Sequence, residues 1–403
     1  MKIANTLWFV ALVLCFVSIS FADGKPKLTS DEFFNFVSYP SVALSPDGNS
    51  VVIGTERADW DRQVSRDDLW LYRDDGKGGS TIQLTQSGHD IDPKWSPDGR
   101  WIAFRSERRP PSEKDSDSDD DKSQDKHKDE DKHKDKNDDK GDASQIYLIS
   151  PSGGEAIPLT RGHEEVHTYS WSSDSRTIYY ATRNPWTKTQ KDDYKKQWKD
   201  VVQYRTAERG DTIFALDVAA ALALHQSAPS KEQSDAEKES DLTPGAHAIA
   251  TMPLRVNDLV TSPDGSKLAF LSSAINQREE KLEDYEIYAL DLAHPTPLQL
   301  THNQAQEEKL HWANDSRHIF FSVQVGNVNG PYRDLQPHLY WVESEKLDTE
   351  KIDTGKLDSE KTATEKSENE KPGRGTGTVE QWSKDFIGPV EHYTVAADHV
   401  LAS

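Results

Sequence analysis

The stretch Pro93–Phe104, with the sequence PKWSPDGRWIAF, places a tight turn between two segments typical of β-strands. Pro97 fixes φ for the first corner of a type I turn, Asp98 tolerates the bridge conformation, and Gly99 suits the left-handed position that follows. This turn chemistry predicts a β-hairpin with a G1 bulge.

The same turn recurs along the chain. Ser-Pro-Asp-Gly also stands at 45–48 and 262–265, and degenerate copies in which Ser replaces the Gly stand at 172–175 and 313–316. Ser45 and Ser96 are 51 positions apart, as are Ser262 and Ala313. This spacing is close to the period of about 40–50 residues that is typical of propeller blades.

Each full unit supplies four short β-type segments. In the first unit the turn is followed by Val51–Ile53, Leu69–Tyr72 and Ile82–Thr85. The first, second and fourth units end in a segment of four residues: a hydrophobic residue, then Gln or Pro, then Leu, then Thr. In the fourth unit this segment is Leu298–Thr301. The sequence therefore predicts an all-β fold, a β-propeller of four-stranded blades with five recognisable repeats.

The last residues read as the start of a sixth repeat. Val390–Leu401 contains Ala397-Asp398-His399 where the other units have Pro-Asp-Gly, and the sequence ends at Ser403 within a predicted strand. A propeller that ends in an unpaired hairpin has an open edge. We therefore expect the propeller at 23–403 to be incomplete and the natural protein to continue.

Charge and composition narrow the choice of partners. The formal net charge of −22 argues against nucleic acid and anionic membranes, because phosphate binding requires clustered Lys and Arg. We expect peptide substrates or a protein partner instead. The hydrophobic content of 34% is low, but the deficit is concentrated in three polar inserts.

Residues 1–22 have the features of a secretory signal peptide: Lys2, an apolar segment, and Ser20-Phe21-Ala22 as a cleavage site. An N-terminal membrane anchor is the alternative interpretation. Cys15 is the single cysteine and lies in this segment, so the mature chain would have neither disulfides nor thiolate metal sites. The sequence thus predicts an exported protein, periplasmic or extracellular.

The inserts at 111–142, 227–241 and 344–376 are dominated by charged and polar residues, so we expect them to be disordered. His127 and His133 in the first insert are candidates for metal binding, although His and Lys in a charged coil are usually solvated. We expect no metal site.

The insert at 185–209 is different, because it predicts a helix. Thr189 and Asp192 match a capping box, and Tyr194, Trp198, Val201 and Arg205 follow at helical spacing. A packed lid over a blade edge is the structural alternative to a functional helix.

The sequence contains no catalytic constellation. Gly-x-Ser-x-Gly, His-Glu-x-x-His, a phosphate-binding loop and a dinucleotide fingerprint are all missing. Asp47, Asp98 and Asp264 recur, but turn chemistry explains them. We expect no catalytic residue, metal or cofactor site in this chain.

The repeats, together with the lead-in Leu28–Phe34, Gln145–Ile149 with Gly153–Ala156, and Arg183–Trp186, resemble the propeller of the prolyl oligopeptidase family of serine peptidases, the group with dipeptidyl and acylaminoacyl peptidases. The SPDG repeats are shared with non-catalytic TolB-like propellers. The resemblance covers essentially all of the mature chain. It implies an α/β-hydrolase domain with a Ser-Asp-His triad, which this sequence does not contain.

The resemblance also implies a role for the helical insert. In dipeptidyl members a pair of Glu residues on a propeller-borne helix binds the free amine of the substrate. The corresponding segment here has one Glu, so that specificity is not supported. Tyr204, Arg205 and Glu208 are the candidate substrate-binding residues, with a salt-bridged helix end as the structural alternative.

Two hypotheses from different classes follow. The first is the gating and substrate-selecting propeller of an exported serine peptidase acting on peptides, with the hydrolase domain outside this chain. The second is a TolB-like periplasmic propeller that binds protein partners without catalysis. A degenerate product without function is a third reading.

Overall fold

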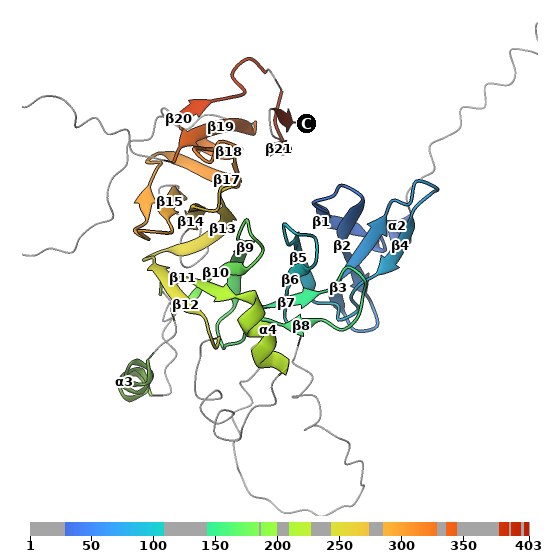
Figure 1. Ribbon diagram of the computed structural model, residues 1–403, viewed down its shortest axis with the longest axis horizontal. Coiled ribbons are helices and arrows are strands. Elements are labelled where there is room, and N and C mark those ends of the chain that lie inside the picture. Colours follow the sequence, from blue (N-terminus) through green and yellow to red (C-terminus); the bar gives the residue numbers. More distant parts are fainter. Residues whose placement is uncertain are drawn as a thin grey trace, which may run out of the picture.

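A computed structural model describes residues 29–108, 143–184, 187–199, 209–226, 243–273, 285–328, 336–344, 379–386, 388–395 and 399–402. These residues form five four-stranded antiparallel sheets and one two-stranded sheet, and the sheets follow one another in chain order along a curved path (Figure 1). The predicted all-β propeller fold is thus confirmed. We number the four-stranded sheets as blades one to five.

Each blade is a simple up-and-down meander. Blade one contains β1 (Ser38–Leu44), β2 (Ser50–Asp59), β3 (Val64–Arg73) and β4 (Ser80–Gln83). Blade two contains β5 (Asp90–Trp95), β6 (Ile102–Ser106), β7 (Gln145–Ile149) and β8 (Ile157–Pro158). Blade three contains β9 (Val166–Trp171), β10 (Thr177–Arg183), β11 (Asp211–Asp217) and β12 (His247–Thr251).

The remaining sheets continue the pattern. Blade four contains β13 (Arg255–Thr261), β14 (Lys267–Ser273), β15 (Ile287–Asp291) and β16 (Leu298–Gln299). Blade five contains β17 (Gln304–Trp312), β18 (His318–Asn327), β19 (His338–Glu343) and β20 (Val379–Gln381). The hairpin of β21 (Tyr393–Val395) and β22 (Val400–Ala402) lies where the start of a sixth repeat is predicted.

The repeated turn has the predicted geometry. Gly48, Gly99 and Gly265 adopt φ of 74°, 71° and 73°, in the left-handed region. In the turn of blade two, the Ser96 hydroxyl donates to Asp98 Oδ1 at 2.7 Å, and Asp98 Oδ1 accepts the Arg100 N–H at 3.0 Å. The turns of blades one, three and four repeat both bonds. The Ser and Asp of the motif therefore fix the turn, as the turn chemistry predicts.

The two degenerate turns connect neighbouring blades. Ser175 and Ser316 occupy the left-handed position with φ of 63° and 54°. The backbone N–H of Asp98 donates to Ser175 Oγ at 2.9 Å, and that of Asp264 donates to Ser316 Oγ at 3.0 Å. Each Ser therefore offsets the strain of a positive φ with a bond that a glycine lacks.

Tryptophan side chains also connect neighbouring blades, including blades one and two. The indole N–H of Trp95 donates to the Ala43 carbonyl at 3.0 Å, and that of Trp171 donates to the Lys94 carbonyl at 3.2 Å. Trp312 repeats the contact at the junction of blades four and five. Blade four has Thr261 instead, whose N–H donates to Ser170 Oγ at 3.1 Å.

The Thr of the closing strand has a repeated role. The hydroxyl oxygens of Thr85, Thr160 and Thr301 each accept a hydrogen bond from a backbone N–H in the third strand of the same blade, at 2.8 to 2.9 Å. The donors are Leu69, Ile146 and Ile287. Ser383 accepts the N–H of Leu339 at 3.1 Å in the same way. Residues Val379–Ser383 are therefore the closing segment of the fifth repeat, which the sequence pattern did not reveal.

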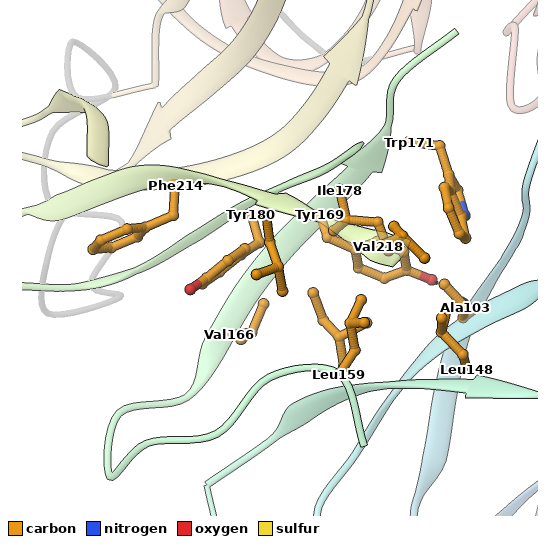
Figure 2. Close-up of a cluster of buried hydrophobic side chains, with 12 residues drawn as sticks. Ala103, Leu148, Leu159, Val166, Tyr169, Trp171, Ile178, Tyr180, Phe214 and Val218 are labelled. Atoms are coloured by element: carbon orange, nitrogen blue, oxygen red, sulfur yellow. Dashed lines mark hydrogen bonds between the residues drawn. The ribbon is translucent and has the colours of Figure 1, made fainter. Parts of the chain in front are cut away.

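Apolar side chains fill the space between blades. In blades two to five the second and third strands carry a stacked aromatic pair at directly opposite positions: Phe104 and Tyr147, Tyr180 and Phe214, Phe270 and Tyr288, Phe321 and Tyr340. Figure 2 shows one inter-blade cluster, in which Ala103, Leu148 and Leu159 of blade two meet Tyr169 and Tyr180 of blade three. Such pairs and clusters stabilise the sheets and their contacts.

Among the described residues, three helices lie outside the sheets. The predicted lead-in helix is present as α2 (Ser30–Phe34). Helix α3 (Lys188–Trp198) confirms a helix in the insert, but its capping box is formed by Thr187 and Gln190, so the prediction of Thr189 and Asp192 as the capping box was wrong. Thr187 precedes the predicted Thr189 in the sequence, and the hydroxyl of Thr187 accepts the N–H of Gln190.

Helix α4 (Val218–Gln226) was not predicted. Its Val218 is buried, and Ala221 and Leu222 pack against the cluster of Figure 2. The predicted signal peptide at 1–22 and the inserts at 111–142 and 227–241 lie outside the described residues, as do 345–376 of the third insert. Ser344 is the first residue of the predicted third insert, and it is buried at the end of blade five.

Candidate functional site: a polar cavity along the inner strands

A cavity of about 550 Å³ is lined by the first strands of blades one to four and by further strands of blades one and two. Its lining comes from β1, β2 and β3 of blade one, β5 and β6 of blade two, β9 of blade three and β13 of blade four. Seven of the fourteen lining residues are Asp, Glu, Lys or Arg, so a ligand in the cavity would meet charged as well as apolar surface.

Backbone irregularities shape this lining. The register shifts between Ile91 and Lys94 in β5 and between Asn257 and Val260 in β13. Asp92 and Asp258, within these shifts, have φ of 53° and 46°. Such bulges redirect side chains, and non-glycine residues at positive φ are costly. Both aspartates line the cavity.

One carboxylate of the cavity lining, that of Asp92, interacts with two cations. Asp92 Oδ2 lies 3.8 Å from Lys94 Nζ and 3.4 Å from Arg105 Nε. Both cations reach into blade three, since Lys94 Nζ donates to the Tyr169 carbonyl at 2.7 Å and Arg105 donates to the Val166 carbonyl at 3.1 Å. These two cations are thus already engaged within the protein.

Asp258 is held differently. Its Oδ2 accepts the backbone N–H of Leu310 at 2.5 Å, which connects blades four and five. Burial raises the pKa of Asp258 above its ordinary value, although the Leu310 bond and the charge of Lys94 oppose that change.

A histidine network lies next to the cavity at blades three and four, and His167 is its member that lines the cavity. His167, with 1% of its side chain exposed, places Nδ1 2.6 Å from Asp211 Oδ2 and Nε2 3.3 Å from Glu165 Oε1. Asp211 Oδ2 also accepts the N–H of Val256 at 2.8 Å, and Arg255 lies 3.0 Å from Glu165. The hydrogen bond from His167, followed by the charges of His167 and Arg255, outweighs burial and lowers the pKa of Glu165 to about 2.

The opposite wall, in blades one and two, is acidic. Glu56 of β2 and Asp67 of β3 are directly opposite each other in the strand register. Burial, and then the charges of Glu56 and Asp68, raise the pKa of Asp67 above its ordinary value. Asp90 of β5 is 1% exposed and pairs through Oδ1 with Arg108 at 2.5 Å.

The structure does not describe the candidate residues chosen from the sequence. Tyr204, Arg205 and Glu208 fall at 201–208, outside the described residues, so their role stays a prediction. The sequence reasoning missed the cavity residues. One signal was available: β5 reads Asp-Ile-Asp-Pro-Lys-Trp, with three charged residues in a strand next to a buried core.

Within the part of the chain that the structure describes, no group of three His, Cys, Asp or Glu side chains is arranged to hold a metal ion. His127 and His133 lie outside that part. No helix among the described residues is long and apolar enough to span a membrane.

No family model matches the sequence. An uncharacterized peptidase, YuxL, of Bacillus subtilis (strain 168) is 27% identical over 154 residues, which are 38% of this chain and 19% of that protein. The acylaminoacyl peptidase of Pyrococcus horikoshii aligns with 93% of this chain and 44% of its own, with a TM-score of 0.51 and 10% identity. A putative TolB from Agrobacterium tumefaciens aligns over 77% of both chains, with a TM-score of 0.42 and 15% identity.

The chain therefore spans less than half the length of these two peptidases. The similarity to the Pyrococcus enzyme extends over nearly the whole chain and is a similarity of fold. The resemblance inferred from the SPDG repeats is thus confirmed at that level: this chain has a propeller fold of the kind found in an acylaminoacyl peptidase.

Proposed function

We propose that this chain is the gating and substrate-selecting propeller of an exported serine peptidase of the prolyl oligopeptidase family. In this proposal an α/β-hydrolase domain outside the sequence carries the catalytic triad, and peptides reach it past the blades. The signal peptide at 1–22 would direct the protein to the periplasm or the exterior.

The observation that carries the proposal is the polar cavity along the inner strands. It is lined by residues of four successive blades, and the Asp, Glu, Lys and Arg side chains among them come from blades one, two and four. A surface of this kind selects ligands by size and charge, as expected of a gate that precedes a catalytic centre. The fold shared with an acylaminoacyl peptidase and the partial match to a peptidase support the same reading.

The size of the natural polypeptide tests the proposal. An antibody raised against the α3 segment would detect the protein in extracts of the source organism. A product several hundred residues larger than 403, with serine peptidase activity that co-purifies, supports the proposal. A stable product no larger than the 45.4 kDa of this sequence overturns it.

The second candidate function, a TolB-like propeller that binds a protein partner, is favoured by an exposed aromatic cluster. Phe33, Phe34 and Trp60 are each more than half exposed, and Phe34 meets Trp60 edge-on with ring centroids 6.1 Å apart. The Trp60 indole donates to Asn35 Oδ1 at 2.7 Å, which holds the ring at the surface. Exposed apolar patches commonly mark protein interfaces.

Replacing two of these rings by alanine tests the second function. The pair Phe34→Ala and Trp60→Ala should abolish capture of a partner from a periplasmic extract if the protein is a binding module. A peptidase propeller would keep its hydrolase activity in the same double variant.

A further inference from the structure

The junction between blades four and five contains a buried carboxyl group without a cationic partner among the described residues. Glu307 of β17 is 1% exposed. Its Oε2 accepts a hydrogen bond from the hydroxyl of Thr301 at 2.8 Å, and its Oε1 accepts one from the side-chain amide of Asn303 at 2.7 Å. A buried carboxyl group in this setting is favoured in its protonated, uncharged form.

A second carboxylate is bound by the same asparagine. Glu286, directly before β15 of blade four, is 2% exposed, and its Oε1 accepts the backbone N–H of Asn303 at 2.9 Å. Asn303 thus holds one carboxyl group with its backbone and the other with its side chain. Burial, and then the charge of Glu286, raise the pKa of Glu307 well above its ordinary value, although the hydrogen bonds from Asn303 and Thr301 oppose that change.

The junction between blades one and two has acidic residues at the same two repeat positions. Asp90 takes the place of Glu307, because each lies five residues before the tryptophan that ends its strand. Asp68 takes the place of Glu286, because each carboxylate accepts a backbone N–H from the loop that leads to the next blade. The two junctions can therefore be compared position by position.

The two junctions differ in their counter-charges. Asp90 pairs with Arg108 at 2.5 Å, and Asp68 lies 3.7 Å from Arg66. Glu307 forms no ion pair within the part of the chain that the structure describes. Arginines therefore compensate the ionised carboxylates at the first junction, whereas Glu307 is neutral only while it carries a proton.

Other titratable groups lie at or near the junction between blades four and five. Asp258 of β13 lines the cavity, and its carboxylate accepts the N–H of Leu310 across this junction. The titratable groups close to Glu307 along the chain are His302, Glu308, Lys309 and His311. A change of the junction with pH must therefore be assigned to Glu307 with a variant that keeps all of these groups.

We propose that Glu307 is a pH-sensitive lock between blades four and five. While the carboxyl group is protonated, it is uncharged, and its bonds with Thr301 and Asn303 hold the connecting loop against β17. When the proton passes to water, the carboxylate left behind is buried without a described counter-charge and repels Glu286, so the junction loosens. Because Asp258 bonds to Leu310 across the same junction, the loosening reaches the cavity. The lock would act whether or not the chain belongs to a peptidase.

The pH dependence of thermal unfolding tests the lock in the full chain. Glu307→Gln replaces the carboxyl group by an uncharged amide of the same shape, so the variant should have a Tm about 3 °C higher than the parent at pH 8. This gain should shrink as the pH falls and vanish below the ordinary value of 4.5, where the carboxyl group is protonated in both the folded and the unfolded chain. Asp90→Asn is the matched control, and it should lower the Tm at pH 8 because it removes the partner of Arg108.

A buried thiol shows where the structure opens. Ala305 lies fully buried between blades four and five, and Ala103 lies fully buried between blades two and three. Ala305→Cys and Ala103→Cys, each combined with Cys15→Ser, give chains with a single thiol, and the rate of labelling by iodoacetamide measures its exposure. Ionisation of the thiol raises both rates, so their ratio is the quantity of interest. From pH 6 to pH 8 the rate at position 305 should rise about tenfold more than the rate at position 103, and Glu307→Gln should remove this excess.

A Tm difference between Glu307→Gln and the parent that stays constant from pH 4 to pH 8, or a lower Tm of the variant at pH 8, overturns the lock. Equal pH dependence of labelling at the two positions also overturns it. An excess at position 305 that survives Glu307→Gln does so as well, since Asp258 or a histidine would then be responsible. If a cysteine variant does not fold, the Tm comparison alone decides. The proposed function is tested separately, by the size of the natural polypeptide.

Discussion

The two walls of the cavity use similar residues in opposite ways. At blades three and four, Glu165 and Asp211 flank His167, and Arg255 completes the network. At blades one and two, Glu56 and Asp67 face each other with hydroxyl groups as their only described partners. The carboxylates of the first side are paired with His167 or Arg255, whereas on the second side Asp90 pairs with Arg108, and Glu56 and Asp67 form no ion pair among the described residues.

This difference separates structural charges from charges available to a ligand. A buried charge network holds blades together when every member has a partner, and it is strongly destabilised when one member is lost. Carboxylates that repel each other weaken the fold they belong to. Substitutions in the two walls should therefore change stability in opposite directions.

The largest expected effect is at His167. His167→Leu leaves Asp211 buried with only the Val256 N–H as a described partner, and should lower the free energy of unfolding by about 3 kcal/mol. Urea unfolding followed by tryptophan fluorescence measures it. Adding Asp211→Asn should recover part of the loss, because the amide oxygen still accepts from Val256. A loss below about 0.5 kcal/mol would show that this wall is not a coupled network.

A smaller effect is expected at the centre of the cavity. Asp92→Asn leaves Lys94 and Arg105 without their shared carboxylate, but each keeps a hydrogen bond to a backbone carbonyl. The side chain of Asp92 is 33% exposed, so we expect a loss of about 1 kcal/mol. Thermal unfolding at low and high salt measures the change, and salt should reduce it. An unchanged Tm at low salt would argue that the backbone bonds alone position both cations.

The pH dependence of stability should differ between the walls. The pKa of Glu165 is lowered to about 2, so the stability it contributes is full above its ordinary value of 4.5 and is lost as the pH falls towards 2. Its side chain is 44% exposed, and solvent screening limits the contribution to about 1 kcal/mol. Glu165→Gln should therefore destabilise the protein at pH 7 and have little effect near pH 2. A pH-independent difference would contradict this sign.

The smallest effect has the opposite sign. The pKa of Asp67 is raised, so its ionised form costs stability at neutral pH, and this cost vanishes below the ordinary value of 3.8. Asp67→Asn should increase the free energy of unfolding at pH 7 by about 0.5 kcal/mol, and the gain should shrink as the pH falls. Denaturant titrations at pH 7 and pH 4 compare the two proteins. A loss of stability at pH 7 would mean that Asp67 has a structural partner.

The repeated turns were predictable because their chemistry is local. Ser96, Asp98 and Gly99 bond to one another and to adjacent backbone, so the sequence contains the whole interaction. The closing strand of the fifth repeat escaped detection because Trp382 and Ser383 replace Leu and Thr. Helix α4 escaped because Val218–His225 is apolar on all sides and shows no helical period, although Asp217 caps it by accepting the N–H of Ala220.

The cavity was not predictable from the sequence for a physical reason. Asp92, Arg105 and His167 come from separate strands, and only the packing of blades places them together. Bulges within β5 and β13 then turn Asp92 and Asp258 toward the cavity, and their bulge positions carry no Gly signal. The partners of a carboxylate, which decide its role here, are a property of the folded chain.

The tryptophans that connect the blades also give the protein a built-in reporter. The indole N–H groups of Trp95, Trp171 and Trp312 each span a different junction, between blades one and two, two and three, and four and five. Their hydrogen exchange would therefore report the opening of three separate junctions, one signal for each. In a repeat protein whose units contact only their neighbours, such signals distinguish an array that opens blade by blade from one that unfolds as a single unit.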